Sequence, residues 1–199
     1  VSAYIRLHVS AVGGDVNRVT GGIVVTIKDV GLTFDFEGLE ASRNVGLKAL
    51  WLPEEPTAST PYAPDCEWSG AICKDTADDP DDPRIPYRIE VRYPTPDVGF
   101  AFVGDAEIVR EETRDNLTMI EIAADYRGTE YDHPGMESAS FIMIFDAENG
   151  YTVLISSTMY GFDVLEKIAA SLEIHVFTDT HDGFPPVSVG YIPIQPGRG

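Results

Sequence analysis

The chain has 199 residues, of which 43% are hydrophobic, and it carries a formal net charge of -19 at pH 7. The length allows one domain or two small ones with a sizeable core, and the apolar fraction is that of a globular protein rather than a disordered one. The charge argues against nucleic acid and anionic membrane surfaces as partners, because phosphate binding needs clustered lysines and arginines. It permits cations or basic partners, and adaptation to salt would produce the same composition.

Residues 1–52 predict an N-terminal module rich in β-strands. Apolar and polar side chains alternate along residues 5–10, 23–28 and 32–37. This alternation is typical of antiparallel strands with one face buried and one face in water. Residues 38–52 fit either a short helix or a strand.

Residues 53–84 have a different composition. They contain six prolines and nine acidic residues, against only Lys74 and Arg84 as basic residues. Such a composition resists regular structure and predicts a long acidic, proline-rich surface loop. Long loops within compact domains are often functional, although disorder would give the same pattern.

The two cysteines of the chain, Cys66 and Cys73, both fall in this predicted loop. Their placement suits a local disulfide in an oxidising compartment, for which the chain-entropy model gives about 2–3 kcal/mol. Two free thiols are the alternative, and two ligands alone cannot make a structural zinc site. A bridge would hold Trp68 near the surface, where it would either contact a partner or pack on its own domain.

Asp75, Asp78 and Asp79 begin an acidic run that continues to residue 83. They are the candidate metal ligands, because calcium prefers several carboxylate oxygens. The run lacks the glycine at the sixth place and the glutamate at the twelfth that an EF-hand loop requires. A solvated acidic loop is the competing interpretation. We expect no cofactor, and a calcium ion bound by this run is the alternative.

Residues 85–178 predict a second module of sheet and helix. Alternating and apolar segments predict strands over residues 87–93, 100–103, 106–110 and 117–124, with a turn at residues 114–116. The polar stretch that follows contains Asp132 and His133, the best candidates for a metal, acid–base or partner-binding site. Simple solvation of a loop histidine beside acidic residues is the alternative.

Residues 141–174 carry the strongest pattern in the chain. Two apolar runs, 141–145 and 151–155, flank a segment that closes with Asn149-Gly150, so they predict a β-hairpin. Their unbroken apolar character predicts that both faces are covered. After Gly161, apolar side chains recur at three- and four-residue steps, which predicts an amphipathic helix over residues 162–174.

The same stretch resembles the C-terminal end of a bacterial domain family of unknown function. Asn149-Gly150-Tyr151 and Leu165-Glu166-Lys167-Ile168-Ala169-Ala170-Ser171-Leu172 are similar to the strand pair and helix that close this family. Leu52-Pro53-Glu54-Glu55 resembles its L-P-E-G sequence, with Glu55 in place of the glycine. The family occurs at the C-terminus of membrane-anchored, anti-sigma-factor-like and sporulation-associated proteins. The resemblance implies an extracytoplasmic location and a fold, and it implies no established activity.

These patterns together predict an α+β protein. We expect an antiparallel β-sheet of many strands with one C-terminal amphipathic helix packed on it, followed by an extended tail over residues 179–199. The chain begins at Val1 without an initiator methionine or signal peptide, so we expect a trimmed or mature form. No stretch approaches 18 consecutive apolar residues, and we expect no membrane insertion by this segment.

The sequence contains no recognised catalytic pattern, such as a G-x-S-x-G elbow, a phosphate-binding loop or H-E-x-x-H. We therefore expect a non-enzymatic sensing or interaction domain of a bacterial envelope protein, secreted or membrane-anchored outside the cell. Its partner would be a protein or a cell-wall component. The alternatives are a cell-wall polysaccharide hydrolase with paired carboxylates and a calcium-stabilised adhesion module.

Overall fold

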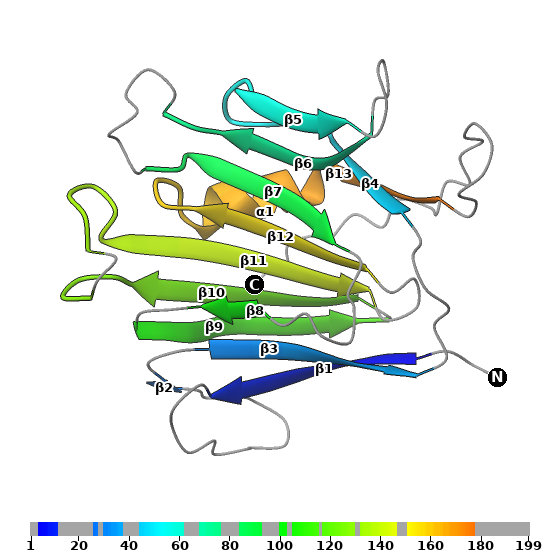
Figure 1. The fold of residues 1–199 in the computed structure, drawn as a ribbon, viewed down its shortest axis with the longest axis horizontal. Helices are drawn as coiled ribbons and strands as arrows, with labels where there is room; N and C mark the ends of the chain where they lie inside the picture. The colour runs from blue at the N-terminus through cyan, green and yellow to red at the C-terminus, as the bar shows by residue number, and fades with distance from the viewer. Residues whose placement is uncertain are drawn as a thin grey trace.

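The computed structural model describes residues 4–11, 26–27, 30–37, 44–61, 68–76, 84–92, 100–102, 105–115, 117–129, 132–146 and 151–177. Within these ranges the chain forms two antiparallel β-sheets and one helix (Figure 1). In chain order the elements are β1 (Tyr4–Ala11), β2 (Thr26–Ile27), β3 (Val30–Glu37), β4 (Asn44–Ala49), β5 (Ala58–Pro61), β6 (Ser69–Lys74), β7 (Tyr87–Arg92), β8 (Phe100–Phe102), β9 (Asp105–Arg114), β10 (Leu117–Asp125), β11 (Ser138–Asp146), β12 (Tyr151–Ser157), α1 (Phe162–Ala170) and β13 (Leu172–Phe177).

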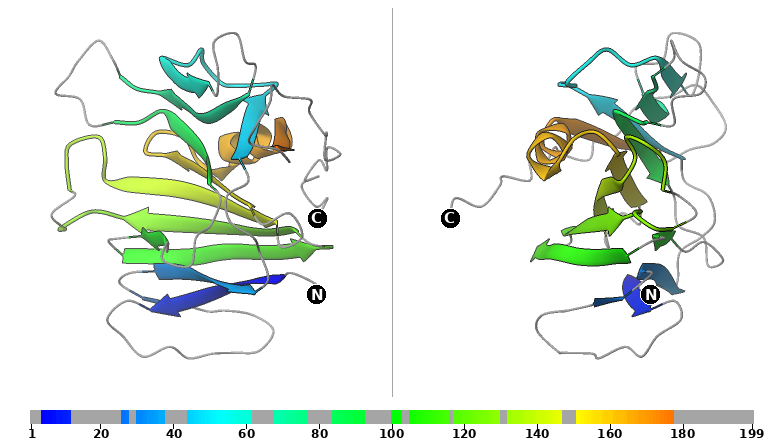
Figure 2. Two further views of the ribbon diagram at one scale, coloured as in Figure 1. Left: turned by 45° about the vertical axis from the view of Figure 1, so that its right-hand side comes forward. Right: turned by 90° about the vertical axis from the view of Figure 1, so that its left-hand side faces the viewer.

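The larger sheet has ten strands in the order β13-β4-β6-β7-β12-β11-β10-β9-β2, and β5 pairs with β6 beside this path. The sheet curves, and α1 lies on its inner side (Figure 2). The prediction of an antiparallel sheet of many strands with one helix packed on it is confirmed, although the helix is a minor element. Of the described residues, none forms a helix with the length and apolarity needed to cross a membrane.

Strands β11 and β12 form the predicted hairpin at the centre of this sheet. Their register places Ile142 opposite Ile155, and both side chains are buried in the core beneath α1. Met143 points to the opposite face and is buried as well. The prediction that both faces are covered is therefore confirmed, while the turn residues 147–150 lie outside the described part of the chain.

Helix α1 is held mainly by its apolar face. Leu165, Ile168 and Ala169 are buried against the sheet, as the three- and four-residue spacing predicted. Asp163 places a carboxylate in the first turn, where the helix dipole favours negative charge. No side chain caps the helix at Gly161, so packing has to supply most of its stability.

The prediction that the helix extends to residue 174 is wrong. Helix α1 ends at Ala170, and Leu172–Phe177 form β13, which pairs antiparallel with β4. In β13 Leu172 and Val176 are buried, and both lie on one face of the strand because side chains alternate. Pairing with β4 satisfies the backbone hydrogen-bonding groups of these residues.

The prediction of a loop over residues 53–84 is wrong for the residues of β5 and β6. Strand β6 lies inside the larger sheet, between β4 and β7. Its Ile72 is buried opposite Ile89 of β7, and this packing outweighs the acidic, proline-rich composition of the flanks. Pro61 ends β5, an outer strand, where the missing N–H is tolerated.

The smaller sheet has the order β1-β3-β8 and confirms the predicted strands near the N-terminus. Strands β1 and β3 pair along their full length, from Tyr4 opposite Glu37 to Ala11 opposite Val30. Of the strand predicted over residues 23–28, only β2 is described, and it pairs with β9.

Each sheet combines strands from more than one of the predicted segments, whose boundaries lie at residues 52 and 84. The larger sheet combines β4 from the first segment, β5 and β6 from the second and most strands of the third. The turn predicted between β9 and β10 is confirmed, and Asp115 adopts a positive φ of 53° there, which aspartate tolerates better than most residues. The tail over residues 179–199 lies outside the described residues.

Candidate functional site

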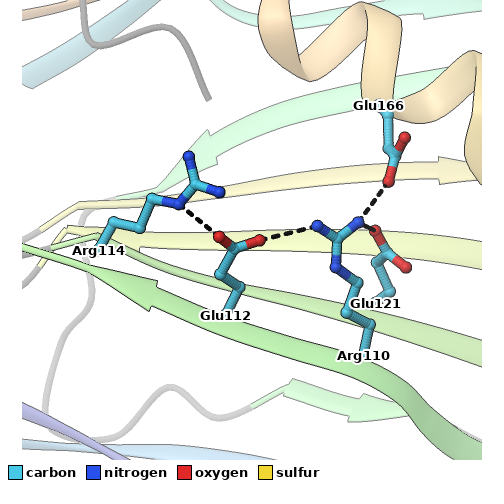
Figure 3. A network of polar contacts seen from close by, with 5 residues as sticks. All are labelled: Arg110, Glu112, Arg114, Glu121 and Glu166. Atoms are coloured by element: carbon cyan, nitrogen blue, oxygen red, sulfur yellow. Dashed lines mark hydrogen bonds and ion pairs between the residues drawn. The ribbon is translucent and has the colours of Figure 1, made fainter. Parts of the chain in front are cut away.

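Two arginines and three glutamates form a polar network where Glu166 of α1 reaches the side chains of β9 and β10 (Figure 3). Nη1 of Arg110 donates to Oε1 of Glu121 at 3.3 Å and to Oε1 of Glu166 at 2.7 Å. Nη2 of Arg110 donates to Oε2 of Glu112 at 2.8 Å. The other oxygen of Glu112 accepts a hydrogen bond from Nε of Arg114. One guanidinium group therefore connects two neighbouring strands to the helix.

The strand register explains why these side chains meet. Side chains alternate along a strand, so Arg110, Glu112 and Arg114 of β9 lie on one face. Strand β10 places Glu121 directly opposite Arg110, and the register shifts immediately after this pair. Such a bulge changes the direction of the side chains next to it. Glu166 reaches the same point from α1, where it follows the buried Leu165.

Glu121 is the most buried acid of the network, with a side chain that is 7% exposed. Burial is the main cause that raises the pKa of Glu121 to about 7. A hydrogen bond with Glu166 acts in the same direction, while the positive charge of Arg110 opposes the shift. Glu121 therefore keeps its proton to a higher pH than an exposed glutamate does.

The outer part of the network stays ionised. The hydrogen bond from Arg114 is the main cause that lowers the pKa of Glu112. Desolvation alone would lower the pKa of Arg110, but the hydrogen bond to Glu112 and the charges of the surrounding carboxylates outweigh it and raise that pKa. The group of the network that exchanges a proton near neutral pH is therefore the carboxyl group of Glu121.

The carboxyl pair has some of the chemistry that a polysaccharide hydrolase needs, since one acid has a raised pKa beside a second carboxyl group. Its geometry differs from that of a hydrolase. In a hydrolase the space of about 5 Å or more between the two carboxyl groups takes the scissile bond, whereas here one nitrogen of Arg110 bonds to both Glu121 and Glu166. Nor does the described part of the chain contain a group of three or more His, Cys, Asp or Glu residues that could hold a metal ion.

Residues 50–54, which we call the strap, pass along α1 and are attached near both ends of the helix. At the C-terminal end, the N–H of Leu50 donates to the carbonyl of Ser171 at 3.0 Å. The hydroxyl of Ser171 in turn donates to the carbonyl of Trp51 at 3.0 Å. These two bonds fix the start of the strap at the junction between α1 and β13.

The other end of the strap is attached just before the N-terminus of α1. The buried Tyr87 donates its hydroxyl to the carbonyl of Glu54 at 2.8 Å, and Tyr160 donates its hydroxyl to the carboxylate of Glu54. Burial is the main cause that raises the pKa of Tyr87 to about 12, so this donor keeps its proton. A nine-residue helix is about 13 Å long, and four residues of extended chain cover about the same length.

The strap exposes two large apolar side chains next to each other. Leu50 is 58% exposed and Trp51 is 42% exposed, whereas Leu52 packs against the core. The pair lies at the end of β4, beside β13, the terminal strand of the larger sheet. Sequence analysis did not single out these residues. The sequence did contain a signal, the apolar run Leu50-Trp51-Leu52 before Pro53. Three large apolar side chains in a row between a strand and a proline are more than one buried position can take up.

Trp68, the predicted partner-contacting aromatic, packs on its own domain. Its ring lies 5.0 Å from the ring of His175 on β13, with 30° between the two planes. Trp68 is half-buried, and burial lowers the pKa of His175. Of the two alternatives for Trp68, the structure shows the packed one, and a contact with a partner stays a prediction.

Asp132 and His133 lie in the connection between β10 and β11, and both are exposed. The carboxylate of Asp132 accepts a hydrogen bond from the N–H of Gly128 at 2.7 Å. The carbonyl of His133 accepts one from the N–H of Met136 at 2.9 Å. These contacts shape the connection, and a metal or acid–base role for the two residues stays a prediction.

The predicted cysteine and calcium residues are only partly described. Cys73 is a free thiol in the structure, and its Sγ donates to Oδ2 of Asp75 at 3.8 Å. Burial is the main cause that raises the pKa of the Cys73 thiol. Cys66, Asp78 and Asp79 lie outside the described residues, so the disulfide and the calcium site stay predictions.

Comparisons with known proteins assign the chain to no family. A scan against protein-family models gave no match, and searches of the curated proteins and of the solved structures found no significant match. The resemblance of residues 141–174 to an extracytoplasmic family therefore stays a prediction, and the function has to be argued from the contacts described above.

Proposed function

We propose that this chain is a non-enzymatic extracytoplasmic interaction domain of a bacterial envelope protein, α+β in class. It binds a protein or a cell-wall component through the strap and the adjoining edge of the larger sheet. The observation that carries the proposal is the exposure of Leu50 and Trp51 side by side at this edge. Exposed apolar neighbours of this kind are characteristic of interaction sites, and tryptophan is among the residues that dominate binding energy.

The sheet edge supports the same assignment. Strand β13 is terminal in the strand order of the described sheet, so an extended segment of a partner can add to it by backbone pairing. Trp51 would then contact the side chains of that segment. The net charge of -19 favours a partner with a basic surface, because complementary charge accelerates association.

The polar network supports binding rather than hydrolysis. A hydrolytic pair needs room for a sugar and a water molecule between its carboxyl groups. One nitrogen of Arg110 instead bonds to both Glu121 and Glu166. We therefore assign this network to the attachment of α1.

Replacing Trp51 with alanine should weaken binding to the partner by about thirtyfold, the effect of losing an anchor worth roughly 2 kcal/mol. The assay is co-sedimentation with purified bacterial cell-wall sacculi, once with and once without their covalently attached proteins. Met159→Ala is the matched control, because Met159 is 46% exposed and lies outside the strap.

Binding only to protein-bearing sacculi would identify a protein partner, and equal binding to both preparations would identify the wall polymer. Equal affinity of the wild type, the Trp51 variant and the Met159 variant would contradict a site at the strap. Release of new reducing ends from sacculi by the wild type, abolished in Glu121→Gln, would replace the binding proposal with the hydrolase alternative.

The proposed location predicts the state of the cysteines. Freshly exported protein, denatured without reduction, should show no free thiol, and reduction should release two, because an oxidising compartment favours a bridge between Cys66 and Cys73. A thiol-specific chromophore measures this directly. Two thiols before reduction would contradict the extracytoplasmic location and would match the free Cys73 thiol of the structure.

A further inference from the structure

We propose that Arg110, Glu121 and Glu166 form a proton-dependent latch that links α1, which packs on β11 and β12, to the neighbouring strands β9 and β10. The inference concerns the conformation of the fold and is independent of the proposed partner. The three side chains come from three different elements, and one guanidinium nitrogen bonds to both glutamates. The position of α1 on this side of the sheet therefore depends on the charge state of the pair.

The charges around the pair do not balance when every acid is ionised. Strand β9 contributes two positive groups, Arg110 and Arg114, and one negative group, Glu112. Helix α1 contributes Glu166, and β10 contributes Glu121. Three carboxylates then face two guanidinium groups, and one negative charge remains uncompensated. Uptake of one proton makes the network neutral.

Strand β11, on the other side of β10, contributes no positive charge that could balance an ionised Glu121. Strand β11 places the buried, apolar Ile142 opposite Glu121. The uncompensated charge is consequently held in a poorly solvated place, because the side chain of Glu121 is only 7% exposed. An ionised group in such a place is unfavourable, so the proton is retained at a pH where an exposed glutamate has lost it.

Loss of this proton should loosen the attachment of α1. Two carboxylates would then repel each other across one guanidinium, while the apolar contacts of Leu165 and Ile168 would remain. The folded-state pKa of Glu121 lies above its value in an unfolded chain. The stabilising contribution is therefore complete below the unfolded pKa and is lost as pH rises through about 7.

The test is amide hydrogen exchange of α1, measured between about pH 5 and pH 8 and corrected for intrinsic exchange rates. For one linked proton, the opening equilibrium constant of the helix should rise by up to about tenfold per pH unit between about pH 4.3, the pKa of an exposed glutamate, and about pH 7, and should level off above that. Glu121→Gln should remove this dependence, because the amide cannot ionise. Glu112→Gln is the matched control, since Glu112 bonds to the same arginine but is 25% exposed and has a lowered pKa.

An unchanged pH dependence in Glu121→Gln would overturn the proposal. A second measurement on the unaltered protein avoids the question of whether the variant folds: the side-chain carboxyl carbon of Glu121 is titrated by NMR. A midpoint near neutral pH supports the latch, and a midpoint close to that of an exposed glutamate, about 4.3, contradicts it.

Discussion

Replacing Arg110 with alanine should lower the free energy of unfolding by about 2–4 kcal/mol at pH 8. Removing one partner of a buried ion pair typically costs about 3–5 kcal/mol, because the remaining charge is left uncompensated. The effect should be somewhat smaller here, since the side chain of Arg110 is 33% exposed and that of Glu166 is 26% exposed. Urea unfolding followed by circular dichroism measures the change.

Arg114→Ala is the matched control for this prediction. Arg114 belongs to the same strand and bonds to Glu112, but its side chain is 51% exposed. An exposed pair of this kind contributes up to about 1 kcal/mol. Equal destabilisation by the two variants would show that Arg110 has no special position in the network.

The loss caused by Arg110→Ala should also depend on pH. At about pH 5 Glu121 keeps its proton, so fewer negative charges are left without a partner when the guanidinium is removed. The destabilisation should therefore be larger at pH 8 than at pH 5. A difference in the opposite direction would mean that Glu121 is already ionised in the acidic solution, and the latch would lose its basis.

Short-range patterns predicted the centre of the fold correctly. The apolar runs of β11 and β12 and the spacing of Leu165 and Ile168 identified a hairpin and a helix, because burial on both sides of a strand or on one side of a helix leaves a local signature. The failures occur where a partner distant in sequence decides the structure. Strand β6 was predicted as loop, since the strand β7 that buries it follows a gap of acidic and proline residues.

The polar network could not have been predicted from one sequence. Glu121 lies 11 residues from Arg110 and Glu166 lies 56 residues from it, so only the sheet register and the placement of α1 bring them together. Alone, the charged residues of β9 resemble any solvated strand face. Trp68 shows the same limit, because the ring that packs against it belongs to His175, more than a hundred residues away in the chain.

Truncating one of the two helix side chains that are fully buried should have the other large effect. Leu165→Ala is expected to lower the free energy of unfolding by about 2–5 kcal/mol, since Leu165 is 0% exposed and its removal leaves a cavity between α1 and the sheet. Urea unfolding gives the change. Met159→Ala, at an exposed position shortly before the helix, should change stability by less than about 0.5 kcal/mol.

The comparison between Leu165→Ala and Glu121→Gln separates the two ways in which α1 is held. The apolar contacts of Leu165 do not titrate, so its variant should lose the same amount of stability at pH 5 and at pH 8. Glu121→Gln should differ from the wild type mainly at the higher pH. If Leu165→Ala instead abolished the pH dependence, Glu121 and Glu166 would come together only when the apolar face of α1 is fully packed. The latch would then be a consequence of that packing rather than an independent attachment.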